Sequence, residues 1–186
     1  ARIIAAARRN IEWALTQQTA SGWFRTNGFT AEQVPFTHTI AYAIRGILEC
    51  GVLLDEARYV EAALKAARGL AAQQRADGFL AGTYGDGWVP HASYCCVTGV
   101  SQSALNWLRF DQHAGSGEFA VAADRALDYL KKNHRITGTG TPEARDISSI
   151  MLRSLRSSGS IVLPDTGSPP NMAATTRPPW DNSAIF

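Results

Sequence analysis

The sequence predicts an all-α protein, an array of helical hairpins followed by an irregular tail. Three observations predict it. Apolar residues recur at helical spacing, amphipathic segments alternate with almost wholly apolar ones, and a polar-to-glycine pattern repeats along the chain. A chain of 186 residues is long enough to bury one core, so one folded domain is expected.

Five segments have the three-to-four spacing of helices: 2–18, 37–50, 55–74, 93–110 and 118–133. The first, third and fifth are amphipathic; in the first, Ile3, Ile11 and Leu15 fall on one stripe. The second, "THTIAYAIRGILEC", and the fourth carry few charges and should be the more deeply buried. We therefore expect two inner helices ringed by outer ones, with Thr37 and Ser93 as the N-caps of the inner pair.

The ends of the outer helices share a pattern in which a polar residue precedes a glycine by four positions. It occurs as Gln18–Gly22, Gln74–Gly78 and His134–Gly138, in copies 56 and 60 residues apart. A period of this size is typical of helical-hairpin arrays. We expect each glycine to take a positive φ where the helix stops, and each glutamine to bond the free backbone groups of the following loop.

Two of these stretches carry a resemblance to known families. "WALTQQTASGWF" and "GLAAQQRADGFL" resemble degenerate copies of the glutamine–tryptophan repeat of terpenoid cyclases and protein prenyltransferases. Residues 8–134 also resemble uncharacterised bacterial proteins with an (α/α)-toroid or six-hairpin glycosidase-like domain, associated with polysaccharide gene clusters, in which "GWF", "THTIAY" and "VTG" recur. The resemblance implies a partial (α/α) toroid and a carbohydrate as the substrate class.

The helical pattern fails after Arg135, which divides the chain into a helical-hairpin domain, 1–135, and an irregular Pro/Ser-rich extension, 136–186. Five of the eight prolines follow Ser157, a composition that buries little surface, and only 145–155 has the spacing of a short helix. Five or six helices are too few to close a toroid, so an open arc is expected. An open arc exposes an apolar flank at each end, which predicts a homo-oligomer or capping by the tail.

Composition argues against several classes of partner and cofactor. The formal charge of +2, from 18 basic and 16 acidic residues, is too balanced for a nucleic-acid binder. No run of about 20 apolar residues would cross a membrane, and three cysteines make no disulfide framework, which favours a cytoplasmic location. The sequence has neither the aspartate clusters of terpene cyclisation nor a phosphate-binding glycine-rich loop, and no cofactor is expected.

Candidate site residues gather where the two inner helices begin, because helix N-termini direct free amides and positive dipole ends into one mouth. If both starts open on one side, a common cleft is lined by Trp23, His38, Tyr42, Arg45, Asp86, Trp88, His91 and Gln102. Tryptophans beside acids and amides suit a sugar, whose C–H faces stack on rings while its hydroxyls need polar partners. A sugar or oligosaccharide is the expected ligand.

His38, Asp86 and Tyr42 are the candidate catalytic residues, and the other five are candidates for substrate binding. A neutral His38 in the first turn of a helix would act as a base, with Asp86 or Glu32 as the acid, in a hydrolase, lyase or epimerase. No pair of carboxylates stands out as a glycosidase dyad.

A structural interpretation of the same residues stands beside this one. His38 suits a capping or core role, the two tryptophans suit plugs between hairpins, and Asp86 in "GDG" suits a turn. "HASYCC" offers zinc-type ligands, but adjacent cysteines on a helix point about 100° apart, so no metal is predicted. Cys95 and Cys96 are more typical of apolar packing than of nucleophiles. The alternative function is a non-catalytic helical-array scaffold or protein-binding module. In an enzyme His38, Tyr42 and Asp86 should all project into one solvent-filled pocket, whereas in a scaffold each should be buried singly with backbone partners.

Overall fold

The computed structural model describes residues 2–133, and that part of the chain is helical, which confirms the all-α class. Its elements are α1 (Arg2–Thr16), α2 (Thr37–Leu54), α3 (Ala57–Ala71), the 3-10 turn η1 (Asp86–Trp88), α4 (Val97–Ala114) and α5 (Ala120–Asn133). The tail 136–186, its short helix 145–155 and the third polar-to-glycine copy at His134 lie outside the described residues.

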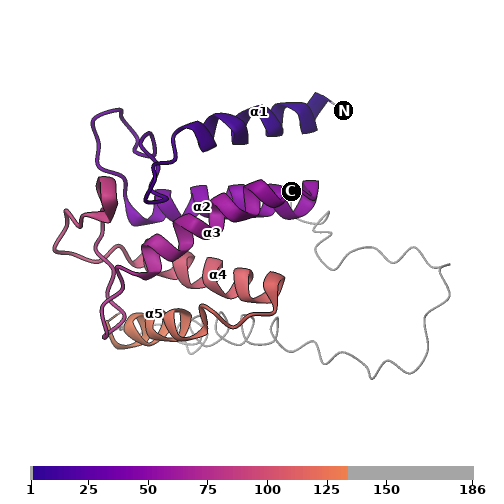
Figure 1. Ribbon diagram of the computed structural model, residues 1–186. Coiled ribbons are helices and arrows are strands. Elements are labelled where there is room, and N and C mark those ends of the chain that lie inside the picture. The colour runs from indigo at the N-terminus through magenta and orange to yellow at the C-terminus, as the bar shows by residue number, and fades with distance from the viewer. Residues whose placement is uncertain (1, 134–186) are drawn as a thin grey trace, which may run out of the picture.

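Within the described residues the helices form two hairpins, and the remaining helix, α1, has no hairpin partner there. α2 packs against α3, α4 packs against α5, and α2 also packs against α4, whereas α1 contacts the rest more sparsely and chiefly through α2. Figure 1 shows the long connections 17–36 and 72–96 together at one end of the array, on the left, where α2 and α4 begin. We call this the loop end.

Burial follows the predicted division into inner and outer helices. Three of the 18 residues of α2 are exposed, against five of the 15 residues of α3. Ile40, Ile44 and Leu48 of α2 are fully buried, as are Val100 and Ala104 of α4. The two nearly uncharged helices therefore supply much of the core.

The two described copies of the glutamine pattern make equivalent contacts. Gln18 Nε2 donates to the Ala62 carbonyl of α3 at 2.8 Å, and Gln74 Nε2 donates to the Ala122 carbonyl of α5 at 2.9 Å. Gln18 also donates to the Gly22 carbonyl of its own loop at 3.2 Å, as predicted. Because Ala62 and Ala122 are 60 positions apart, the repeat in the sequence is also a repeat of tertiary contacts.

The glycines of the pattern have the predicted left-handed backbone and lie directly against an outer helix. Gly22 has φ +90°, and a Cβ there would lie 2.9 Å from the Lys65 carbonyl oxygen of α3. Gly78 has φ +89°, and a Cβ there would lie 2.1 Å from the Arg125 carbonyl oxygen of α5. Only glycine combines this φ with so close an approach.

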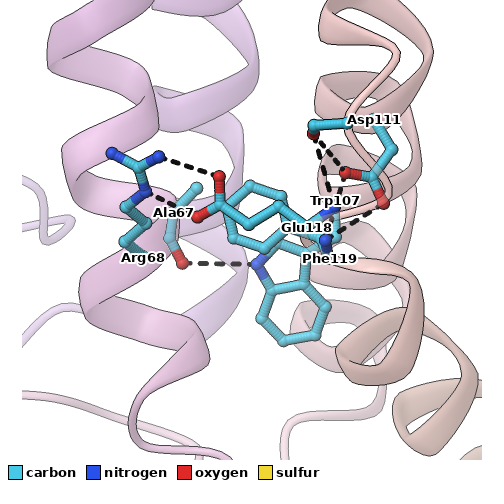
Figure 2. Close-up of polar contacts among 7 residues, drawn as sticks. Ala67, Arg68, Trp107, Asp111, Glu118 and Phe119 are labelled. Atoms are coloured by element: carbon cyan, nitrogen blue, oxygen red, sulfur yellow. Dashed lines mark hydrogen bonds and ion pairs between the residues drawn. The ribbon is translucent and has the colours of Figure 1, made fainter.

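Polar contacts also join α3 to the second hairpin (Figure 2). Arg68 of α3 makes a bidentate ion pair with Glu118, with N–O distances of 2.6 and 2.8 Å. Trp107 of α4 donates its indole N–H to the Ala67 carbonyl at 3.3 Å and stacks on Phe119, with ring centroids 6.5 Å apart. A buried indole needs such an acceptor, so this bond fixes where α4 crosses α3.

Thr37 is not the N-cap of α2, contrary to the prediction. The N-cap is Phe36, and Thr37 is already the first helical residue. Its backbone N–H donates to the Gly82 carbonyl at 2.9 Å and its hydroxyl donates to the Ala81 carbonyl. The backbone N–H and the hydroxyl of Thr37 therefore hold the connection 72–96 against the start of α2.

Ser93 is not the N-cap of α4 either. The helix begins at Val97, and the N-cap is Cys96, whose Sγ accepts the Gly99 N–H at 3.4 Å. The chain is held out of the helix just before this point, because the Tyr94 carbonyl accepts the Gly82 N–H at 2.7 Å.

No helix in residues 2–133 is long and apolar enough to cross a membrane.

Candidate functional site

The starts of the two inner helices touch each other. A Cβ on Gly99 of α4 would lie 2.7 Å from the Thr37 Cβ and 2.8 Å from the His38 backbone nitrogen of α2. This approach is possible because position 99 has no side chain. Both helices therefore open at the loop end, with His38 beside the first turn of α4.

His38 is surrounded by aromatic rings. Its ring centroid lies 5.4 Å from that of Phe36 in a stacked arrangement, and 5.9 Å from those of Phe29 and Tyr42. Its Nδ1 lies 3.5 Å from Sγ of Cys96. We call these five residues, Phe29, Phe36, His38, Tyr42 and Cys96, the His38 cluster.

The cluster presents aromatic surface to solvent. Phe29 is 72% exposed and Tyr42 is 52% exposed, whereas the His38 ring between them is half-buried. Tyr94, which is 55% exposed, packs over Gly82 close to the start of α2. Exposed rings of this size are available to stack on a ligand.

Trp23 and Trp88 lie beneath the surface instead of on it. They are 8% and 4% exposed. The Trp23 indole donates to the Tyr84 carbonyl and the Trp88 indole donates to the Ser21 carbonyl, each at 2.9 Å. Each tryptophan thus ties one long connection to the other, so these side chains fix the loop end and leave no open ring face.

Arg45 is held in an ion-pair network between the inner helices. Its Nε lies 2.8 Å from Oε1 of Glu49, and Arg109 of α4 grips both oxygens of the same carboxylate at 2.9 and 3.1 Å. Burial opposes ionisation of Glu49, but the hydrogen bonds and charges of Arg109 and Arg45 outweigh it and lower the pKa of this carboxyl. The network joins α2 to α4.

The other predicted site residues do not join the cluster. Asp86 is exposed and its carboxylate accepts the N–H of Gly87 at 2.8 Å, a turn contact. His91 is exposed over Gly85, and Gln102 is half-buried on α4. Among the described residues, none of these three is in hydrogen-bond or ring contact with His38.

A pocket of about 260 Å³ lies between α1 and α2, which we call the α1–α2 groove. Its lining residues are Asn10, Ile11, Trp13, Ala14, Gln17, Phe24, Thr26, Asn27, Tyr42, Ala43, Gly46 and Ile47. Of the eight predicted site residues, Tyr42 is the one that lines it, and its ring also meets His38. The groove therefore adjoins the His38 cluster at Tyr42 but does not contain His38 or Asp86.

Two further features bear on the sequence "HASYCC", the grouping of ligand-type side chains and the thiol of Cys95. Residues 2–133 bring together no group of three or more His, Cys, Asp or Glu side chains that could hold a metal ion. Burial, and then the charge of neighbouring Cys96, raise the pKa of the Cys95 thiol. A thiol with a raised pKa is a poor nucleophile at neutral pH.

Sequence reasoning missed three members of the cluster. Phe29 and Phe36 flank "TAEQVP", and this spacing gives no sign that the loop folds back onto His38. Cys96 was considered as a ligand or nucleophile, whereas the structure makes it a helix cap in contact with His38.

Comparison of the chain with protein-family models, with curated proteins and with solved structures finds no match. What defines the molecule is therefore its own architecture, a helical-hairpin array with an aromatic cluster over the starts of its inner helices.

Proposed function

We propose that this domain, a partial (α/α) toroid of helical hairpins, binds a sugar or oligosaccharide at the His38 cluster. The observation that carries the proposal is the aromatic cluster at the adjoining starts of α2 and α4, where the His38 ring contacts the exposed rings of Phe29 and Tyr42.

Each part of the cluster suits one part of a sugar. The exposed faces of Phe29 and Tyr42 offer the apolar surface on which C–H faces stack. The Tyr42 hydroxyl and the His38 ring supply a donor and an acceptor for hydroxyl groups. Trp23 and Trp88 support the site by locking the two connections together.

The geometry favours binding over catalysis. A glycosidase uses two carboxylates roughly 5–9.5 Å apart across the scissile bond. Asp86 and Glu32, the candidate acids, are both exposed, and neither hydrogen-bonds to His38. Catalysis as a hydrolase, lyase or epimerase would require an acidic side chain to lie beside the His38 cluster when the substrate is bound.

Isothermal titration calorimetry against a panel of neutral sugars and uronic acids tests the proposal. Phe29→Ala and Tyr42→Ala should each weaken ligand binding about 2- to 12-fold, because a stacked ring contributes about 0.5–1.5 kcal/mol. Trp13→Ala is the matched control, since Trp13 is 53% exposed but lines the α1–α2 groove and is not part of the cluster. Absence of any sugar binding, or a loss confined to Trp13→Ala, would overturn the assignment of the site.

A homo-oligomer remains part of the proposal, since an open array leaves flanks uncovered. Sedimentation equilibrium of the full chain decides it, and a monomer at all concentrations would contradict it.

A further inference from the structure

The repeat in tertiary contacts gives a register for comparing the three outer helices. Residues of α3 and α5 correspond at a shift of 60, as their contacts with Gln18 and Gln74 show. Gln18 and Gln74, which follow the ends of α1 and α3, are 56 positions apart, so residues of α1 and α3 correspond at a shift of 56. Each position on α1 can therefore be compared with its counterparts on α3 and α5.

Compared in this way, α1 has no hairpin partner among residues 2–133. Tyr59 at the start of α3 is 1% exposed and packs over Gly51 of α2. Phe119 before α5 is 3% exposed and packs on the aromatic rings of α4. The corresponding residue of α1 is Ile3, which is 85% exposed. The position that is buried at Tyr59 of α3 and at Phe119 before α5 is therefore exposed at Ile3 of α1.

The inner helix α2 has a matching open face. On α4, Gly99, Ser103 and Asn106 form the face toward α2, and all three are buried; the Asn106 amide donates to the Ala41 carbonyl of α2 at 2.8 Å. Their counterparts on α2, at the same shift of 60, are Thr39, Ala43 and Gly46. Gly46 is exposed, and a Cβ there would meet no heavy atom within 4 Å. In the described part of the chain, no inner helix packs on this face of α2 as α2 packs on α4.

The α1–α2 groove lies between these two open faces. Ala43 and Gly46 line one wall, and α1 residues including Asn10 and Ala14 line the other. None of the lining side chains is charged. The Asn27 amide nitrogen in its wall is buried without a hydrogen-bond partner, so it calls for an acceptor from outside the described residues.

We infer that the α1–α2 groove is the seat of an inner helix, and that it binds an uncharged, largely apolar α-helix of a partner protein. The partner helix packs on α1 in the way that α2 packs on α3. It also packs on α2 in the way that α2 packs on α4. The two faces of the partner helix that make these contacts must therefore be uncovered in its own protein. A second copy of this array does not fit, because its α2 and α4 already use the hairpin face to pack on α3 and α5.

The helix α2 itself is the model for the occupant, so a peptide of residues 37–54 is the probe. It carries Arg45→Gln and Glu49→Gln, because these two residues form an ion pair in α2 whereas none of the lining side chains of the groove is charged, and Cys50→Ser to prevent oxidation. Anisotropy of the fluorescein-labelled peptide is measured as the full-length protein is added. A second peptide with Ile44→Asp is the control, because Ile44 is a buried apolar residue of the helix.

Saturable binding of the first peptide is expected, at least tenfold tighter than binding of the control peptide. Gly46→Leu should fill the groove and weaken binding at least tenfold. Ile3→Asp should also weaken binding, because Ile3 is the exposed α1 counterpart of the buried Tyr59 of α3, although it lies outside the pocket lining. Val121→Asp, which changes a 61% exposed residue on α5, should alter binding less than about twofold. Circular dichroism verifies the fold of each variant, and Gly46→Leu has open space at its site.

Three results would overturn the inference. The first is no saturable binding, or equal binding by the Gly46→Leu variant. The second is a protein dimer that Gly46→Leu converts to a monomer without any peptide effect, which would make a second copy the occupant. The third is a sugar affinity that Gly46→Leu abolishes but Phe29→Ala retains. This result would make the groove a sugar site and would also refute the proposed function. If only peptide binding is absent, the proposed function is unaffected.

Discussion

Replacement of Gly78 by alanine tests whether the repeated turns anchor the outer helices. Gly78 has φ +89°, and a Cβ there would lie 2.1 Å from the carbonyl oxygen of Arg125. The substitution therefore imposes two penalties, one from the left-handed backbone and one from the collision with α5.

The two penalties can be estimated separately. A left-handed backbone costs an alanine about 1–2 kcal/mol. Forcing a methyl group against a backbone that must move costs about 1–3 kcal/mol, as in overpacked cores. Gly78→Ala should thus lower the free energy of unfolding by about 2–5 kcal/mol.

Gly115 provides the matched control, because it has φ +64° but a Cβ there would meet no heavy atom within 4 Å. Gly115→Ala should show the backbone penalty alone, about 1–2 kcal/mol. Urea unfolding followed by tryptophan fluorescence measures both variants. If the two alanines destabilise the protein equally, the turn at Gly78 does not pack on α5 and the repeat of tertiary contacts is refuted.

Two further predictions concern the pairing of the inner helices. Glu49→Gln should reduce the free energy of unfolding at pH 7 by about 1 kcal/mol, a figure limited by partial exposure. Because folding lowers the pKa of Glu49 below its ordinary value of 4.5, this stabilisation is present above that value and lost as the pH falls through the folded-state pKa. Urea titrations of wild type and variant should therefore converge in acid, and a constant difference at every pH would contradict the role of the Arg109 pair. Gly46→Ala should raise the free energy of unfolding by about 0.5–1 kcal/mol, since its site is open, whereas Gly99→Ala should lower it by about 1–3 kcal/mol through collision with Thr37. Thermal melts of this pair would refute the packing of α2 on α4 if both variants shifted in the same direction.

Helical spacing predicted the existence and order of the five helices in residues 2–133 and the start of α2 at Thr37, but not the start of α4. Ser93 has the chemistry of a cap, yet α4 begins at Val97 because the Tyr94 carbonyl pairs with Gly82. That contact joins segments 12 positions apart, and no local preference of Ser93 encodes it.

The candidate site was predictable where it depends on one helix. His38 and Tyr42 are four positions apart in α2, and their rings do meet. Whether Trp23 and Trp88 face a ligand or the core was left open by the sequence, because it depends on how the two long connections cross. The α1–α2 groove was missed for a similar reason, since Gly46 becomes informative once it is compared with Asn106 of α4.

The nuclear Overhauser effect between Gly99 and Thr37 in the assigned full-length protein tests most directly whether the inner helices begin side by side. A strong cross-peak between the Gly99 α-protons and the Thr37 side chain is expected, since a Cβ on Gly99 would lie 2.7 Å from the Thr37 Cβ. If Gly99 shows cross-peaks to its own helix but none to Thr37, the inner helices do not meet, and the site built around His38 is not formed.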